Sequence, residues 1–146
     1  MDAFALATVL VTGFIGSAEF GSAALVHPVI RRLKTDDQLI MEKGLLKTFG
    51  RVMPVGMTVA TALAIIIAID EPNAWLLSAA ISLGVALVVT IIGNVPINAR
   101  TGRIAEEAAS EGFIAMRRRW DVFQIVRASL QLLGFVFVAI GVVGFG

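Results

Sequence analysis

The residues best suited to chemistry are ionisable side chains placed inside or beside long apolar segments. Glu19 is the only acid in the first such segment, and His27, the single histidine, closes it just before Pro28. Arg127 stands near the start of the last apolar segment. Ionisable groups inside a membrane are costly and mark functional sites by default. A carboxylate or imidazole can take a proton from a substrate, and an arginine can hold the resulting oxyanion. We therefore predict Glu19, His27 and Arg127 as catalytic residues.

A second set of side chains is expected to bind the substrate at the same depth. On the last apolar segment, four residues from Trp120 to Gln131 are spaced by 4, 3 and 4, which places them on one narrow helical face. Asn94 and Asn98 flank a proline where the third apolar segment ends. A polar stripe that enters an apolar span must point into the bundle or at a water-filled cavity. The predicted substrate-binding residues are Asn94, Asn98, Trp120, Gln124 and Gln131.

Each of these residues also has a purely structural interpretation. Glu19 and Arg127 could form a buried ion pair that pins two helices together. His27 could cap its helix at the membrane surface, and the block from Asn94 to Asn98 could simply end a helix, because proline disfavours helical geometry in the residue before it. The functional interpretation requires polar side chains from the first, third and fourth spans to meet inside one bundle.

Composition identifies the class of protein to which these residues belong. The chain has 146 residues, of which 58% are hydrophobic and 16% charged, against a usual charged share of about 25%. This excess of apolar residues predicts a membrane protein and excludes a disordered chain or a secreted disulfide scaffold. The net charge of +1 predicts no nucleic-acid partner. Without cysteine or a second histidine, and without a phosphate-binding loop, we predict no metal and no cofactor.

Four apolar segments are long enough to cross the roughly 30 Å hydrocarbon core as helices. They lie at about residues 3–30, 52–69, 75–93 and 125–143. The first lacks a basic leader and exceeds the length of a signal-peptide core, so we expect it to be retained. Together the segments occupy most of the chain. We therefore predict a single domain, residues 1–146, with an all-α fold: an integral membrane four-helix bundle.

The positive charges predict its orientation. All twelve Lys and Arg lie in the connection between the first two spans or in the connection into the fourth. The positive-inside rule makes that side cytoplasmic, so both termini lie outside, and we expect the bacterial cytoplasmic (inner) membrane. We interpret the basic runs as topology signals and lipid head-group contacts.

Short cytoplasmic helices are expected in both basic connections. The run from Thr35 to Gln38 has the spacing of a capping box, and the helix it opens would place Leu39, Ile40 and Leu46 on the membrane. Residues 101–125 predict a second cytoplasmic helix, either separate from the fourth span or continuous with it, with glycines at 102 and 112 leaving room for a break.

Small residues recur at intervals of four along several spans. Such rows let helix backbones approach closely, which drives helix association in lipid. They suit a seam inside the bundle and a homo-oligomer contact equally well. The rows are Gly56, Ala60, Ala64 and Ala68, then Gly13, Ser17 and Gly21, and finally Ser78 and Ser82.

Several local patterns together resemble the anthrone-oxygenase-like family of membrane proteins (DUF1772). They are His27-Pro28, Met53-Pro54, Asn94-Val95-Pro96-Ile97-Asn98, and Arg119-Trp120-Asp121-x-Phe123 followed by Arg127. The resemblance covers nearly the whole chain, and its asparagine block followed by Trp and Arg is the more specific part. It implies a four-helix membrane protein; some fungal members are similar to oxygenases that convert anthrones to anthraquinones without an evident metal or flavin motif. Where the family often has a histidine between the Trp and the Arg, this chain has Gln124, which would shift acid–base work to Glu19.

Three functions remain open from the sequence. The first is a cofactor-independent oxygenase, in which a flat phenolic substrate enters from the inner leaflet. Glu19 or His27 would deprotonate it, Arg127 with Asn94 would stabilise the oxyanion, and the carbanion would react with oxygen directly. The second is a small proton-coupled transporter that uses Glu19. The third is a non-catalytic lipid-binding or accessory membrane subunit. The expected partners are the lipid bilayer and a hydrophobic small molecule or lipid.

Overall fold

The protein is described by a computed structural model over residues 1–144; the last two residues of the predicted 1–146 domain lie outside the described residues. Residues 1–144 form helices and contain no strand. The elements are α1 (Ala3–Gly21), the π turn η1 (Ser22–Val26), α2 (His27–Ile30), α3 (Thr35–Lys47), α4 (Phe49–Asp70), α5 (Ala74–Val89), the π turn η2 (Thr90–Asn94), α6 (Val95–Arg103), the 3-10 turn η3 (Glu106–Ala108) and α7 (Glu111–Val143).

Four continuous helical rods are long and apolar enough to cross a membrane: Ala3–Ile30, Phe49–Asp70, Ala74–Arg103 and Glu111–Val143. These rods confirm the all-α integral membrane four-helix fold. The third and fourth rods extend well beyond the predicted segments at the end rich in basic residues. The helix expected over residues 101–125 begins later, at Glu111, and is continuous with the fourth span as α7; the break lies between Arg103, where α6 ends, and Glu111.

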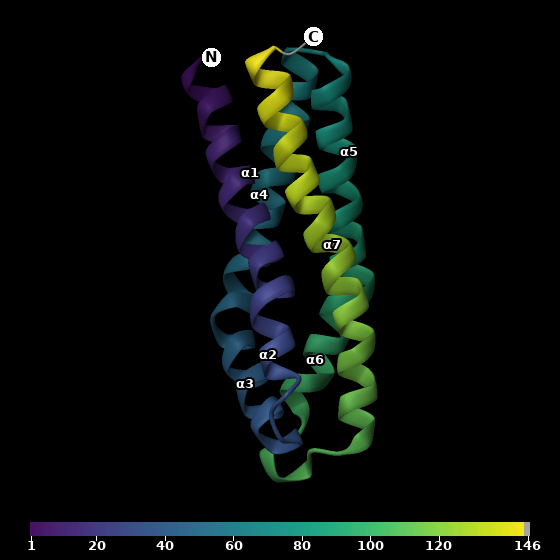
Figure 1. Ribbon diagram of the computed structural model, residues 1–146. Helices are drawn as coiled ribbons and strands as arrows, with labels where there is room; N and C mark the ends of the chain where they lie inside the picture. The colour runs from purple at the N-terminus through teal and green to yellow at the C-terminus, as the bar shows by residue number, and fades with distance from the viewer. Residues whose placement is uncertain (145–146) are drawn as a thin grey trace.

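The rods form an up-and-down bundle. α1 packs against α4 and α7, and α5 packs against the same two helices, so each helix has antiparallel neighbours. Figure 1 shows the N- and C-termini at one end of the bundle and α2, α3 and α6 at the other. The even number of spans therefore places both termini on one side. That this side faces outward stays a prediction.

Small residues let the helices approach closely inside the bundle. At Gly16 a Cβ atom would stand 2.9 Å from the carbonyl oxygen of Gln131, so α1 meets the backbone of α7 directly. Ala60 and Ala64 are fully buried, and Gly56 leaves no room for a Cβ beside Ile15. The row of small residues on α4 is thus a seam within one bundle. A homo-oligomer contact through the other rows stays a prediction.

Two π turns interrupt the first and third rods at equivalent places. Each directly precedes a helix whose second residue is proline, Pro28 or Pro96. Proline offers no N–H and its ring clashes with an α-helical carbonyl. Here the residue before each proline donates its N–H to a carbonyl five residues earlier, Ser22 in η1 and Thr90 in η2. The structural alternative that the block around Pro96 ends a helix is therefore wrong: the wider turn absorbs the proline and the rod continues.

Two local predictions about α3 are also wrong. Thr35 does not cap the helix, because the N-cap is Lys34 and makes no side-chain hydrogen bond. Gln38 instead donates from Nε2 to the carbonyl of Leu33 at 2.8 Å. Leu39 is fully buried and faces the bundle instead of the membrane, since α3 packs against α4 and α6.

Candidate functional site

A buried ion pair links α1 to α7 in the half of the bundle nearer α3. Arg127 Nη2 donates to Glu19 Oε2 at 2.9 Å, and Gln124 Nε2 donates to the same oxygen at 2.9 Å. Arg127 Nε donates in turn to Gln124 Oε1 at 2.7 Å, and Nη1 lies 3.4 Å from the Thr90 hydroxyl. The structure thus brings Glu19 and Arg127 together as the ion-pair interpretation expected. Each side-chain nitrogen of Arg127 makes at least one hydrogen bond within this cluster.

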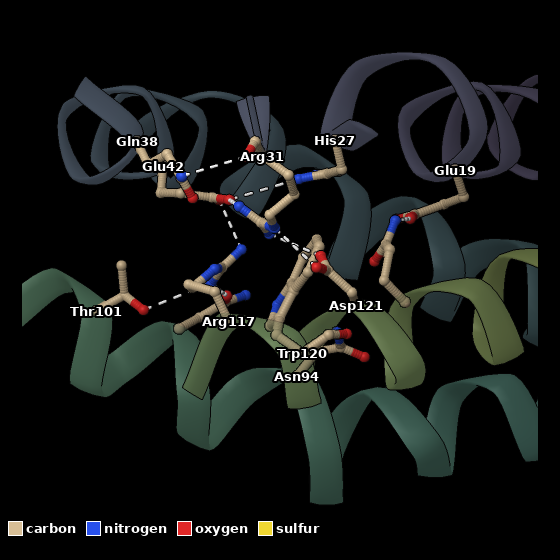
Figure 2. Close-up of polar contacts among 12 residues, drawn as sticks. Glu19, His27, Arg31, Gln38, Glu42, Asn94, Thr101, Arg117, Trp120 and Asp121 are labelled. Carbon is tan, nitrogen blue, oxygen red and sulfur yellow. Dashed lines mark hydrogen bonds and ion pairs between the residues drawn. The ribbon is translucent and has the colours of Figure 1, made fainter. Parts of the chain in front are cut away.

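A second cluster is centred on Glu42 of α3. Its Oε1 accepts from Arg31 at 2.7 Å and its Oε2 accepts from Arg117 at 2.6 Å. His27 Nδ1 lies 3.5 Å from Glu42 Oε1. Arg31 also donates to both carboxylate oxygens of Asp121, at 2.7 and 2.6 Å. Figure 2 shows Glu42 between His27 and Arg117, with Arg31 reaching across to Asp121, so this cluster ties α2 and α3 to α7.

These contacts set the charge state of the second cluster. Burial acts to raise the pKa of Glu42, but His27, Arg117 and Arg31 outweigh it and lower the pKa to about 2. Burial likewise acts to lower the pKa of Arg31, and its hydrogen bonds to Asp121 and Glu42 reverse the effect and raise it. Glu42 therefore stays ionised at neutral pH. The two carboxylates and two guanidinium groups of this cluster balance in charge when His27 is neutral.

Trp120 of α7 is held between a cation and an imidazole. The Arg117 guanidinium carbon lies 4.2 Å from the centroid of its ring, and the His27 ring centroid lies 4.5 Å away at an angle of 52°. Asn94 Nδ2 donates to the Trp120 carbonyl at 3.5 Å. Asn98 Oδ1 accepts from Arg117 Nη1 at 3.4 Å. The His27 ring thus lies against the indole, and its Nδ1 faces Glu42 at 3.5 Å without a hydrogen bond between them.

A cavity of about 260 Å³ lies between the two clusters. Small-ligand sites usually measure about 300–1,000 Å³, so this one suits a small, flat ligand. Its apolar lining comes mainly from the junction of α3 and α4. Its polar lining comes from α2, α6 and α7, from Glu42 of α3 and from the two π turns. The lining residues are Ser22, His27, Glu42, Leu45, Phe49, Gly50, Met53, Pro54, Thr90, Val95, Asn98, Ala99, Trp120, Gln124 and Arg127.

The residues predicted from the sequence divide into two groups around this cavity. Those that line it are His27, Asn98, Trp120, Gln124 and Arg127. Glu19, Asn94 and Gln131 are fully buried and are not part of its lining. Within the described residues, neither polar atom of the Gln131 amide has a hydrogen-bond partner.

Sequence reasoning missed the second cluster. It assigned Arg31 and Arg117 to topology and lipid contact. The lipid contact is wrong for both, because each is ion-paired to Glu42 and the Arg117 side chain is 1% exposed; the topology assignment stays a prediction. A signal was present: Arg117 lies three residues before Trp120 and extends the polar stripe of the last span by one turn. Glu42 lies four residues after Gln38, which places both on one face of α3, yet nothing in the sequence shows that this face turns inward.

The described part of the chain offers no ready set of metal ligands. Within residues 1–144, no three His, Asp or Glu side chains come together where they could hold a metal ion. The carboxylates of Glu42 and Asp121 are already engaged by arginines. The arrangement favours recognition by aromatic packing and hydrogen bonding.

The fold and the two clusters define a membrane-embedded four-helix bundle with a polar site inside one half of the bundle. The sequence profile of the anthrone oxygenase family matches residues 40–137. The chain belongs to the anthrone oxygenase family, as its sequence motifs indicated. Comparisons with curated proteins and with solved structures gave no match. The matched range includes Glu42, Arg117, Trp120 and Arg127, whereas Glu19 and His27 precede it.

Proposed function

We propose that this protein is an oxygenase that oxidises a flat, hydrophobic phenolic substrate of the anthrone type inside the membrane. The observation that carries the proposal is the His27 imidazole, which lies between Glu42 and Trp120 in the wall of a 260 Å³ cavity. Membership of the anthrone oxygenase family supports the same class of reaction. We place the protein in the bacterial cytoplasmic membrane, with the end that carries α3 and α6 on the cytoplasmic side.

The lining of the cavity fits such a substrate. Phe49, Met53 and Trp120 offer apolar and aromatic surfaces against which a planar ring can pack. Asn98 offers a donor for a phenolic or ketone oxygen, because its Oδ1 accepts from Arg117 and its amide N–H groups remain. Arg127 is engaged by its own cluster, so we assign it to positioning Gln124 instead of binding the oxyanion directly.

His27 is the base in this proposal. With Nδ1 directed at Glu42, Nε2 is the nitrogen left to take a proton from the substrate's methylene carbon. Glu42 plays the orienting and charge-stabilising part that a carboxylate plays beside a catalytic imidazole. The two carboxylates and two guanidinium groups of the Glu42 cluster already balance in charge. The imidazolium and the substrate carbanion therefore neutralise each other. Proton transfer therefore places no net charge in the bundle.

The carbanion then reacts with molecular oxygen. One electron passes from the carbanion to O₂, and the two radicals combine to form a carbon–oxygen bond. His27 returns its proton to the peroxide, giving a hydroperoxide on that carbon. Loss of the remaining C–H proton and cleavage of the O–O bond release water and leave a ketone. One oxygen atom enters the product and the other leaves as water, so anthrone and O₂ give anthraquinone and water.

The test is oxygen uptake and quinone formation from anthrone by the purified protein in lipid nanodiscs, corrected for spontaneous oxidation in empty discs. We expect His27→Gln to lower kcat by about 10²- to 10⁴-fold, the usual contribution of general base catalysis. Glu42→Gln should also lower kcat, whereas Glu106→Gln, an exposed carboxylate, should not. A His27→Gln rate equal to that of the native protein would overturn the proposal.

The same preparation separates the alternatives from the sequence. Substrate-driven proton flux in liposomes that is lost in Glu19→Gln would favour a transporter. Saturable binding of anthrone without oxygen uptake would favour a lipid-binding or accessory subunit. The ion pair between Glu19 and Arg127 supports a structural role for Glu19, so we do not assign transport to this chain.

A further inference from the structure

Two other hollows adjoin the cavity, one on each side of the first rod. The lateral groove, about 310 Å³, lies between η1 and the junction of α3 and α4. It is lined by Ser17, Ala18, Gly21, Ser22, Leu25, Val26, Leu45 and Phe49. The interfacial cavity, about 370 Å³, lies between α2 and α7. It is lined by Ala23, His27, Pro28, Arg31, Asp121, Val122, Gln124 and Ile125.

The two hollows offer different surfaces to an incoming molecule. The lateral groove has no charged residue in its lining, and its only polar side chains are the two serines, Ser17 and Ser22. Leu25 on its rim is 73% exposed, within a rod apolar enough to span the membrane. The interfacial cavity is bordered by the ion pair of Arg31 with Asp121. Of these two hollows, the lateral groove is therefore the one that an apolar molecule in the bilayer can enter without passing a charged residue.

The lateral groove adjoins the substrate cavity. Ser22, Leu45 and Phe49 belong to the linings of both. Ser22 is the first residue of the π turn η1, and its carbonyl accepts from the N–H of His27. On the first rod, the small side chain of Ser22 thus separates the groove from the cavity. The π turn η1 positions this side chain and also the proposed base, His27.

We propose that the lateral groove is the route by which the aromatic substrate passes from the bilayer into the cavity, between Ser22 on one side and Leu45 and Phe49 on the other. This inference rests on the proposed function for the class of substrate. It adds which of the two hollows the substrate uses. A flat ring sliding in here meets Phe49 first and arrives beside Trp120 and His27 without crossing a charged pair.

The absence of cysteine from the chain makes a direct test simple, because a single introduced cysteine is the only site for a thiol label. Gly21→Cys places a label in the groove and Val122→Cys places one in the interfacial cavity. Gly84→Cys on α5 is the matched control, since a Cβ at Gly21 or at Gly84 meets no atom within 4 Å. Ser17→Cys gives a second groove position in case the first variant folds poorly.

Entry is measured without turnover, by stopped-flow quenching of Trp120 fluorescence with anthraquinone in a Trp75→Phe background. Trp75 lies at the opposite end of the bundle, so this change leaves Trp120 as the reporter in the cavity wall. Each variant is compared before and after labelling with a bulky aromatic maleimide. The protein is kept in lipid nanodiscs throughout.

We expect the label at Gly21→Cys or Ser17→Cys to slow entry by about tenfold or more, and labels at Gly84→Cys or Val122→Cys to change it by less than about twofold. Slower entry only with the Val122→Cys label, unchanged entry with both groove labels, or no quenching in the unlabelled protein would each overturn the inference. Quenching without any oxygen uptake would instead contradict the proposed oxygenase function and leave the entry route supported.

Discussion

Replacing Glu42 with glutamine should destabilise the protein strongly, although only one atom changes. Glu42 accepts from Arg31 at 2.7 Å and from Arg117 at 2.6 Å, and it faces His27. The Arg117 side chain is 1% exposed, so loss of the carboxylate leaves a buried cation without its partner. Breaking one side of a buried pair typically costs about 3–5 kcal/mol.

The pKa of Glu42 reflects its contacts with His27, Arg117 and Arg31 taken together. It is lowered from 4.5 to about 2 in the folded protein. A difference of this size corresponds to about 3 kcal/mol at neutral pH, because each unit is worth about 1.4 kcal/mol. At about 2–4 °C per kcal/mol, the melting temperature of Glu42→Gln should fall by roughly 10 °C.

The assay is thermal unfolding in detergent micelles, followed by tryptophan fluorescence. Glu106→Gln is the control, because Glu106 is 54% exposed and lies 4.0 Å from Lys43, and such surface pairs contribute about 1 kcal/mol or less. The double variant Glu42→Gln with Arg117→Met should recover part of the loss, since it removes the unpaired cation. A melting temperature of Glu42→Gln within about 2 °C of the native value would mean a loss of about 1 kcal/mol or less in stability. That result would refute the reasoning.

The same interaction predicts a pH dependence with a definite sign. The folded pKa of Glu42 is depressed, so its contribution is complete above the ordinary pKa of about 4.5 and is lost as the pH falls toward about 2. Between these limits the native protein should lose stability more steeply than Glu42→Gln, as measured by melting temperature against pH. Equal slopes in the two proteins would contradict the assigned pKa.

Three further changes test other parts of the structure. Glu19→Gln removes the ion pair with Arg127 and should cost about 3–5 kcal/mol, seen as a lower melting temperature; a neutral result would argue against that pair. Gly16→Ala should cost about 1–3 kcal/mol, because its Cβ would stand 2.9 Å from a carbonyl oxygen of α7, whereas Gly84→Ala meets nothing within 4 Å and should not destabilise; equal effects of the two would contradict the close approach of α1 and α7. Gln131→Leu should leave stability unchanged or raise it by about 1 kcal/mol, because both polar atoms of its amide lack partners within the described residues; a clear loss in the same unfolding assay would show that the amide is bonded after all.

The spans could be predicted from the sequence because apolar length is a local property of the chain. Glu19 and Arg127 could be singled out in the same way, as costly groups in apolar surroundings. A buried ion pair between them was one of the two interpretations that the sequence left open; the other was a catalytic role. The family could be recognised from the asparagine block and the tryptophan that follows it.

The inward face of α3 could not be predicted in this way. Leu39 and Glu42 are buried because α3 folds back onto α4 and α6, and its own pattern does not distinguish that packing from a helix lying on the membrane. The identity of the carboxylate beside His27 depends on this fold-back. For the same reason, Arg117 was interpreted as a head-group contact when its partner lies 75 residues away.

Whether the helix continues through Pro96 also depends on the neighbouring groups, which a local sequence pattern does not reveal. A proline inside a span leaves backbone carbonyls without donors, which is tolerated only where neighbouring groups or a local π adjustment satisfy them. Here Val95 donates to Thr90 across a wider turn. The helix therefore continues where the sequence alternative had it stop.

The two π turns give the bundle a property that matters for anyone redesigning it. One extra residue in a helix turns everything beyond it by about 100° relative to an uninterrupted α-helix. The stretch of α1 before η1 and the stretch of α2 after it are therefore out of phase, and His27 reaches the cavity only because of that offset. Closing η1 to an ordinary α-turn at the same chain length would swing the imidazole away from Glu42, whereas deleting one residue such as Ala24 would close the turn and keep the flanking helices in phase, so the register of this segment is more sensitive to length than to the identity of its apolar side chains.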